Sequence, residues 1–207
     1  MRIKRGFTLV EILVAIAIVA IIGTIMVAIF TNTLRGSNKA QILASLKQNG
    51  QAVLENMDKT IRNADDLICP TADPSRTIVV SQNGTYTRYR IALSTDAPGT
   101  APSSCIGLRK NGCIVWDNPI PQVSELPQSF IGRVCNPLDS MSLAQVLTDT
   151  NTQTGIQIMS GSFATTKPAG FKAAITVNFI LRPGAEVPSS ITGQIDPVTF
   201  QTTVQLR

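Results

Sequence analysis

The feature that most constrains this chain is a run of 23 uncharged, mostly apolar residues from Ile12 to Leu34. As a helix, such a run is about 35 Å long, enough to cross a bilayer core of about 30 Å. Arg2, Lys4 and Arg5 precede it, and basic residues before a span predict a cytoplasmic N-terminus and an exported C-terminal part. The run is too long for the apolar core of a secretory signal peptide. It predicts one membrane-spanning helix.

A single acid, Glu11, lies at the leading edge of this run. A carboxylate inside a membrane costs free energy and by default indicates a function. Arg5 is a poor partner, because it lies six residues away on a badly aligned helical face. A cut between Gly6 and Phe7 would turn the amide nitrogen of Phe7 into a largely cationic amine. Between two axially shifted parallel helices, that amine of one chain can meet Glu11 of the other, which fixes an offset between subunits.

The stretch RGFTLVE, followed by a long apolar helix, resembles the class III signal of type IV pilins and of the pseudopilins of type II secretion. The resemblance covers only the N-terminal part of the chain. It implies that a prepilin peptidase cuts between Gly6 and Phe7 and methylates Phe7, and that Glu11 is the assembly contact. Its implied partners are other pilin or pseudopilin subunits, the peptidase, an inner-membrane assembly platform and, before assembly, membrane lipid. The implied location is the inner membrane and then a periplasmic or cell-surface filament.

A helical pattern continues beyond the apolar run. Apolar residues recur at helical spacing at Ile42, Leu46, Val53, Met57, Ile61 and Ala64. We expect one helix from Phe7 to about Asp66, before Cys69-Pro70, because the residue preceding a proline avoids the α region. This gives four parts: a leader at 1–6, a transmembrane and assembly half-helix at 7–34, an amphipathic half-helix at 35–68 and a β-rich extracytoplasmic head at 69–207.

After residue 70 the chain is rich in Thr, Ser, Gly, Pro and β-branched residues. The predicted strands are 77–82, 86–93, 113–117, 129–135, 155–161, 172–181 and 200–206. Asn83-Gly84 predicts a hairpin turn, residues 94–104 and 183–190 read as loops, and 141–152 as a short helix. The expected fold class is α+β and pilin-like, with an antiparallel sheet packed on the C-terminal half of the long helix. The head's size and the helix end suggest a minor pilin or a J-type pseudopilin.

Four cysteines, Cys69, Cys105, Cys113 and Cys135, lie outside the apolar run. They show no C-x-x-C spacing and the chain has no histidine, so we expect no zinc site and no other bound metal. An even number of cysteines behind a membrane-targeting segment favours disulfides in an oxidising compartment, with four buried free thiols as the alternative. Three pairings are open. The local choice joins Cys105 to Cys113 around a turn at Asn111-Gly112.

The sequence offers little catalytic chemistry. Without histidine, His-dependent acid–base and triad mechanisms are excluded, and no phosphate-loop, dinucleotide or nucleophile-elbow motif is present. We therefore expect no enzyme and no cofactor. Asp65-Asp66 lacks a spaced calcium loop and reads as a solvated helix end. Tyr86, Arg88 and Arg90 share one strand face, which we interpret as a solvent-facing row; a nucleic-acid contact is the alternative.

The net charge of +5 also gives no reason to expect a nucleic-acid partner. Three of the positive charges lie in the leader, so the mature chain would carry +2, from 15 basic and 13 acidic residues. The leading hypothesis is a structural subunit of a type IV pilus-like filament or a secretion pseudopilus. The first alternative is an uncut, membrane-tethered binding or enzymatic domain, and the second is a DNA-uptake pilin.

Overall fold

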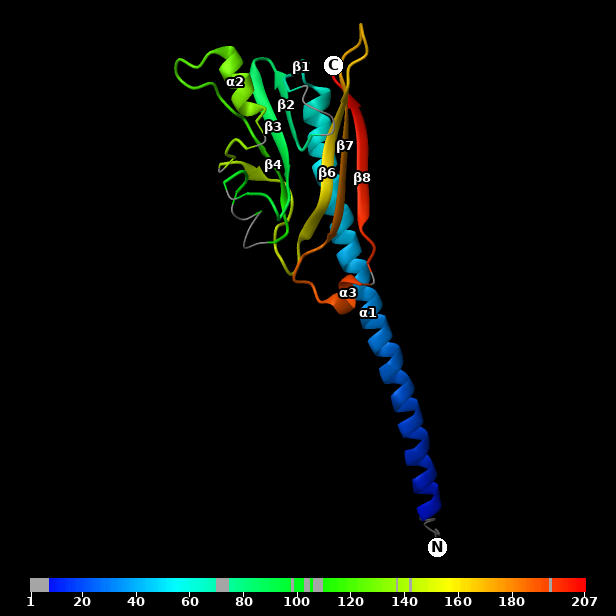
Figure 1. The fold of residues 1–207 in the computed structure, drawn as a ribbon. Coiled ribbons are helices and arrows are strands. Elements are labelled where there is room, and N and C mark those ends of the chain that lie inside the picture. The colour runs from blue at the N-terminus through cyan, green and yellow to red at the C-terminus, as the bar shows by residue number, and fades with distance from the viewer. Residues whose placement is uncertain are drawn as a thin grey trace. The chain divides into compact units, whose positions relative to one another are not determined.

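The structure is a computed structural model of the 207-residue chain that describes residues 8–69, 75–97, 99–102, 105, 110–136, 138–141, 143–193 and 195–207. The chain forms two compact units, Met1–Gln41 and Ile42–Arg207; we call them the first and the second unit. The elements are α1 (Leu9–Arg62), β1 (Asp66–Leu67), β2 (Thr77–Gln82), β3 (Thr85–Ala92), β4 (Cys113–Asp117), α2 (Pro127–Val134), β5 (Gln145–Val146), β6 (Ile156–Thr166), β7 (Ala174–Pro183), α3 (Ser189–Thr192) and β8 (Val198–Gln205) (Figure 1).

The second half of α1 presents one apolar stripe to the head. Its buried residues are Leu46, Gly50, Val53, Met57 and Ile61, at steps of three and four. That spacing places them on one side of a helix with 3.6 residues per turn. Gly50 is part of the stripe because the ring of Phe200 lies directly against it, where any Cβ would overlap the ring. The predicted amphipathic stripe is therefore confirmed with two exceptions. Ile42 is only half-buried, and Ala64 is buried but lies beyond the end of α1.

The predicted antiparallel sheet is in fact two antiparallel sheets. One has five strands in the order β1-β2-β3-β4-β5, and the other has three in the order β6-β7-β8. A bridge joins them, in which the N–H of Ser75 donates to the carbonyl of Phe163 at 2.9 Å and the reverse bond measures 2.6 Å. Both sheets pack on the second half of α1 (Figure 1), and residues of all three form one continuous core. The α+β, pilin-like fold class is confirmed.

The hairpin of β2 and β3 follows its sequence signal closely. Asn83 and Gly84 both have positive φ, 49° and 77°, as a two-residue turn between right-twisted strands requires. Strands 77–82 and 113–117 have the predicted bounds, and 86–93, 155–161, 172–181 and 200–206 fall within two residues or inside longer strands.

Three elements differ from their prediction. Residues 129–135, predicted as a strand, form most of α2 and its C-cap Cys135, with Pro127 at the helix start and Phe130 and Val134 buried four residues apart. Residues 141–152 hold β5 and turns rather than a helix. Helix α1 ends at Arg62 rather than near Asp66, because Asp66 and Leu67 pair with β2 as β1.

Candidate functional site

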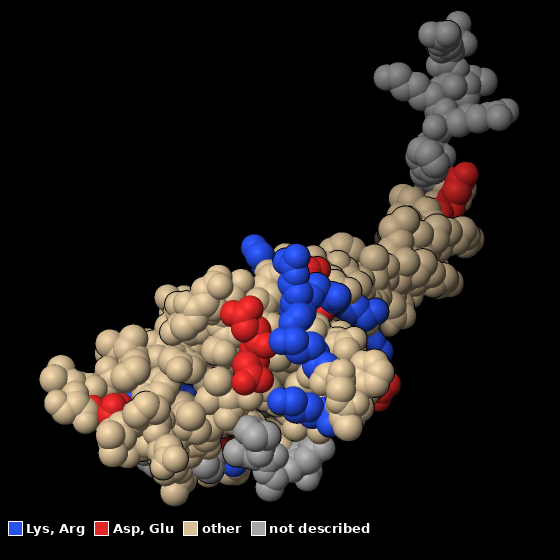
Figure 2. Space-filling view, turned by 90° about the horizontal axis from the view of Figure 1, so that it is seen from above, with Lys and Arg blue, Asp and Glu red and all other residues tan. Residues whose placement is uncertain are grey.

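The described part of the first unit, residues 8–41, is almost entirely helical, and its apolar surface is exposed. All residues from Thr8 to Ala40 are exposed, and sixteen large apolar side chains between Leu9 and Leu34 are 47–78% exposed. The space-filling view shows this segment as an almost uncharged surface (Figure 2). By length and composition, α1 can cross a membrane. An exposed apolar surface of this extent is typical of a segment covered by lipid or by other protein.

Glu11 lies within the first turn of α1. Among the described residues, its carboxylate forms hydrogen bonds only with Thr8. The backbone N–H of Thr8 donates to Glu11 Oε2 at 3.4 Å, and the hydroxyl of Thr8 lies 3.5 Å from the same oxygen. In return, the N–H of Glu11 donates to Thr8 Oγ1 at 3.3 Å. This reciprocal arrangement is a capping box, which satisfies donors at a helix start. The bonds are long, so the carboxylate keeps acceptor positions for a further partner.

Residues 1–27 match the family model of the prokaryotic N-terminal methylation motif. The match contains Gly6, Phe7 and Glu11, and it supports the resemblance to type IV pilins and pseudopilins. The comparisons with curated proteins and with solved structures returned no match. Gly6 and Phe7 lie outside the described residues, so their assignment as the processing site stays a prediction. The methylation motif and the exposed apolar helix together indicate a membrane-anchored, pilin-like chain.

Beyond the methylation motif, the four cysteines of the head form two disulfides. Cys105 is paired with Cys113, the local choice, and Cys69 with Cys135. The second bond ties the segment after β1 to the C-terminal end of α2, where Cys69 packs with Val79, Phe130 and Val134. Among the described residues, no cluster of three or more metal-ligating side chains is present.

The row of arginines on β3 is buried, so its interpretation as a solvent-facing row is wrong. The exposed fractions of Arg88 and Arg90 are 2% and 3%. Backbone carbonyls from two other segments accept hydrogen bonds from the guanidinium groups: those of Val134 and Ser140 from Arg88, and those of Thr100 and Asp139 from Arg90. The same burial removes these arginines as contacts for nucleic acid.

Arg88 is held by two carboxylates. Its Nε and Nη2 donate to Asp117 at 2.9 and 2.6 Å, and its Nη1 donates to Asp139 at 2.5 Å. Burial disfavours the charged guanidinium, but the hydrogen bonds that it donates to Asp117 and Asp139, together with their negative charges, outweigh this effect and raise the pKa of Arg88. The pair Arg88–Asp117 is bidentate, the strongest geometry for this kind of ion pair.

Arg90 has no carboxylate of its own. It donates to Thr77 Oγ1 and to the carbonyls of Thr100, Asn136 and Asp139 at 2.6–3.1 Å. Burial, together with the charge of Arg88, lowers the pKa of Arg90 to about 10, so it stays cationic at neutral pH. Two buried arginines and two partly exposed aspartates therefore form a cluster with no net charge.

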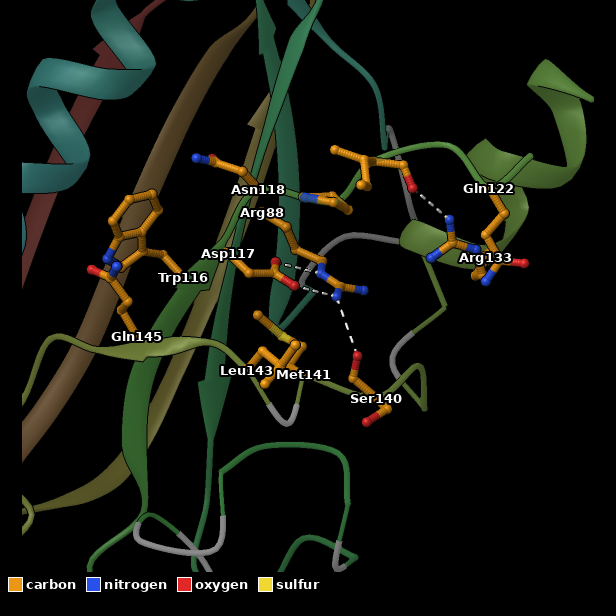
Figure 3. Close-up of a pocket in the computed structure, with 12 residues that line it drawn as sticks. Arg88, Trp116, Asp117, Asn118, Gln122, Arg133, Ser140, Met141, Leu143 and Gln145 are labelled. Carbon is orange, nitrogen blue, oxygen red and sulfur yellow. Dashed lines mark hydrogen bonds and ion pairs between the residues drawn. The ribbon is translucent and has the colours of Figure 1, made fainter. Parts of the chain in front are cut away.

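A pocket of about 490 Å³ opens above this cluster. The ion pair of Arg88 and Asp117 lies at its centre, with Asn118, Ser140 and Leu143 around it (Figure 3). Arg133 and Gln122 lie on one side and Trp116 and Gln145 on the other (Figure 3). Sequence reasoning missed this site because its walls come from β3, β4 and the segments on either side of α2. The only local sign was the polar end of β4, Asp117-Asn118.

Proposed function

We propose that this chain is a structural subunit of a type IV pilus-like filament or a type II secretion pseudopilus. A prepilin peptidase removes residues 1–6 and methylates Phe7, residues 7–34 hold the precursor in the inner membrane, and residues 35–68 connect them to the extracytoplasmic head, residues 69–207. Subunits then leave the membrane and polymerise side by side through their apolar helices, on an inner-membrane assembly platform. The role is structural rather than enzymatic.

The observation that carries this proposal is the apolar, uncovered first unit with Glu11 as its single acid, inside a matched methylation motif. In a membrane this surface is covered by lipid, and in a filament neighbouring helices cover it in the same way. Apolar packing then supplies most of the cohesion. The amine of Phe7 on one subunit pairs with Glu11 on the next and fixes their axial offset, since both charges are otherwise costly at that depth.

The intact mass and the N-terminal residue of the chain, recovered from membranes that contain a prepilin peptidase, test the processing step. We expect a chain that starts at Phe7 and carries one methyl group. A Gly6→Val variant is the control and should keep its full-length mass. A wild-type chain that still starts at Met1 would contradict the proposal and favour an uncut, membrane-tethered domain.

Assembly is tested separately with Glu11→Val, which removes the charge and keeps the helix apolar. We expect this variant to be cut normally but not to enter filaments, which are measured by shearing and by electron microscopy. Glu55→Ala is the matched control, because Glu55 is an exposed acid on the same helix. Normal filaments from Glu11→Val would overturn the pairing with Phe7.

A further inference from the structure

The pocket above the buried arginine cluster has the chemistry of a binding site that the assembly of a filament does not require. Its centre is a carboxylate held in place: both oxygens of Asp117 accept bonds from Arg88, and the Asp117 side chain is still 20% exposed. An ionised carboxylate has about four acceptor positions, and Arg88 occupies two of them. The remaining positions are available to hydroxyl donors, whose bonds to a carboxylate are stronger than bonds between neutral groups.

Three neutral side-chain amides lie around this centre, those of Asn118, Gln122 and Gln145. Gln122 and Gln145 are exposed and line the pocket, and within the described part of the chain their side-chain amides make no hydrogen bond. Asn118 accepts one bond from Thr87 through Oδ1, which leaves its NH₂ group free. These amides approach the pocket from different sides rather than along one line (Figure 3). That arrangement suits a ring of hydroxyl groups better than an extended peptide, whose polar groups follow one axis.

The charges at the pocket cancel. Arg88 and Arg90 balance Asp117 and Asp139, and Arg133 on the wall is paired with Glu125 at 2.9 Å. An anionic ligand therefore finds no free cation, and the exposed edge of Asp117 repels it. Apolar surface is supplied by Trp116, Pro119, Met141 and Leu143. Pockets of a few hundred Å³ that combine apolar walls with a few fixed polar groups are typical of small-ligand sites.

We propose that this pocket binds a neutral saccharide, with Asp117 accepting bonds from ring hydroxyl groups and Asn118, Gln122 and Gln145 completing the polar contacts. The apolar walls then cover the C–H faces of the sugar. This inference does not depend on the proposed filament, because the site lies entirely in the head and uses no residue of the first unit.

The chain contains a single tryptophan, Trp116, which lines the pocket, so its fluorescence reports on the site directly. We would titrate the full-length protein in a zwitterionic detergent without a sugar headgroup. The probes are maltose, lactose, cellobiose and diacetylchitobiose, with anionic sialyllactose and an uncharged Ser-Gly tetrapeptide for comparison. We expect a saturable change with at least one neutral disaccharide, with a Kd on the order of 1 mM, and none with the two comparison probes.

Asn118→Ala and Gln145→Ala each remove one exposed polar contact and should weaken binding by about fivefold, the effect of one neutral hydrogen bond. Gln128→Ala is the matched control, because Gln128 is an exposed amide on α2 that does not line the pocket. The proposal is overturned if no neutral disaccharide gives a saturable change, if the peptide or sialyllactose binds as well as the sugars, or if all three variants behave alike.

Discussion

At the scale of single residues, Glu11 has two possible roles that the choice of substitution separates. It caps its own helix through Thr8, and in the proposed filament it pairs with the amine of Phe7. Glutamine serves in a capping box as well as glutamate does, but it carries no charge. We therefore expect Glu11→Gln to be processed normally, to keep its helix start and still to fail in filament assembly.

The helix start is measured by amide hydrogen exchange of the first turn, and assembly by the yield of sheared filaments. Thr8→Val is the complementary variant, because it removes the capping hydroxyl and leaves the charge of Glu11 intact. It should loosen the first turn by about 1 kcal/mol and still assemble. Filaments from Glu11→Gln at wild-type yield would assign Glu11 to capping alone.

Removing one of the two carboxylates that hold Arg88 should lower the free energy of unfolding substantially. Because its side chain is only 2% exposed, Asp117→Ala leaves a buried charge with fewer partners, and removing one member of a buried pair costs about 3 kcal/mol or more. Chemical denaturation, followed through the fluorescence of Trp116, measures the change in the free energy of unfolding. The control is Asp58→Ala, whose partner Arg62 is 64% exposed and should contribute little. Equal effects of the two variants would contradict the importance of the buried cluster.

The sequence predicts which face of β3 Arg88 and Arg90 share, but it does not predict that this face is buried. Alternation along β3 correctly places both arginines on one face. It does not say whether a further layer covers that face. The partners Asp117 and Asp139 lie 29 and 51 residues away from Arg88, and no local pattern connects them. The candidate pocket depends on the same long-range contacts, so it could not be predicted either.

At the scale of elements, the contact between α1 and β8 depends on a missing side chain. Gly50 has no room for a Cβ beside the ring of Phe200, which is stacked on Phe179 with ring centres 5.4 Å apart. Gly50→Ala should therefore destabilise the head by about 1–3 kcal/mol through overpacking. This is opposite to the usual effect of alanine in a helix, which stabilises by about 1 kcal/mol relative to glycine.

Gly132→Ala tests the same substitution where there is room. Gly132 lies in α2, and a Cβ there meets nothing within 4 Å, so this variant should be as stable as the wild type or slightly more stable. Thermal unfolding followed by circular dichroism compares the two. A Gly50→Ala protein as stable as Gly132→Ala would mean that Phe200 moves aside without cost.

The loop before α2 should be sensitive to acid. Hydrogen bonds from Arg133 and from the N–H of Gln122 lower the pKa of Glu125 to about 2, below its unfolded value of about 4.3. A group with a lowered pKa stabilises the fold above its unfolded pKa, and this contribution is lost as the pH falls towards the folded pKa. The melting temperature of the wild type should therefore exceed that of Glu125→Gln at pH 6, and the two should converge near pH 2. Glu55→Gln, at an exposed position, should show no such convergence.

The elements differ in how well the sequence predicts them, for physical reasons. The apolar stripe of α1 and the turn at Asn83-Gly84 are predicted correctly, because each follows from a pattern of neighbouring residues that the rest of the fold does not change. Residues 129–135 are rich in residues that favour strands, and α2 is only eight residues long, too short for a clear period. Its helical signals were Pro127 at the first turn and the four-residue spacing of Phe130 and Val134. No local sequence pattern predicts the division into two sheets, because it depends on which strands pair with one another.

At the scale of the whole molecule, the two disulfides constrain very different lengths of chain. Cys69 and Cys135 are separated by 66 residues, and Cys105 and Cys113 by only 8. The longer link ties the segment after β1 to Cys135 at the C-terminal end of α2. In the chain-entropy account, a disulfide stabilises the fold by removing conformational entropy from the unfolded chain. The entropy removed grows with the logarithm of the length of the loop that the disulfide closes. For these lengths, the longer link should contribute about 2 kcal/mol more.

We therefore expect Cys69→Ser/Cys135→Ser to lower the free energy of unfolding by more than Cys105→Ser/Cys113→Ser, as measured by denaturation of each pair of substitutions. Cys69, Cys105 and Cys113 are buried, and the partly buried Cys135 packs against Phe130 and Val134. Because serine is similar in size to cysteine, the two pairs of substitutions can be compared directly.

The longer link should also matter for the pocket, because α2 carries Arg133 on its wall. Loss of Cys69–Cys135 should therefore change the fluorescence of Trp116 in the folded state. If the shorter link proves the more stabilising, the head is held together by its local loops rather than by the attachment of α2 to the segment after β1.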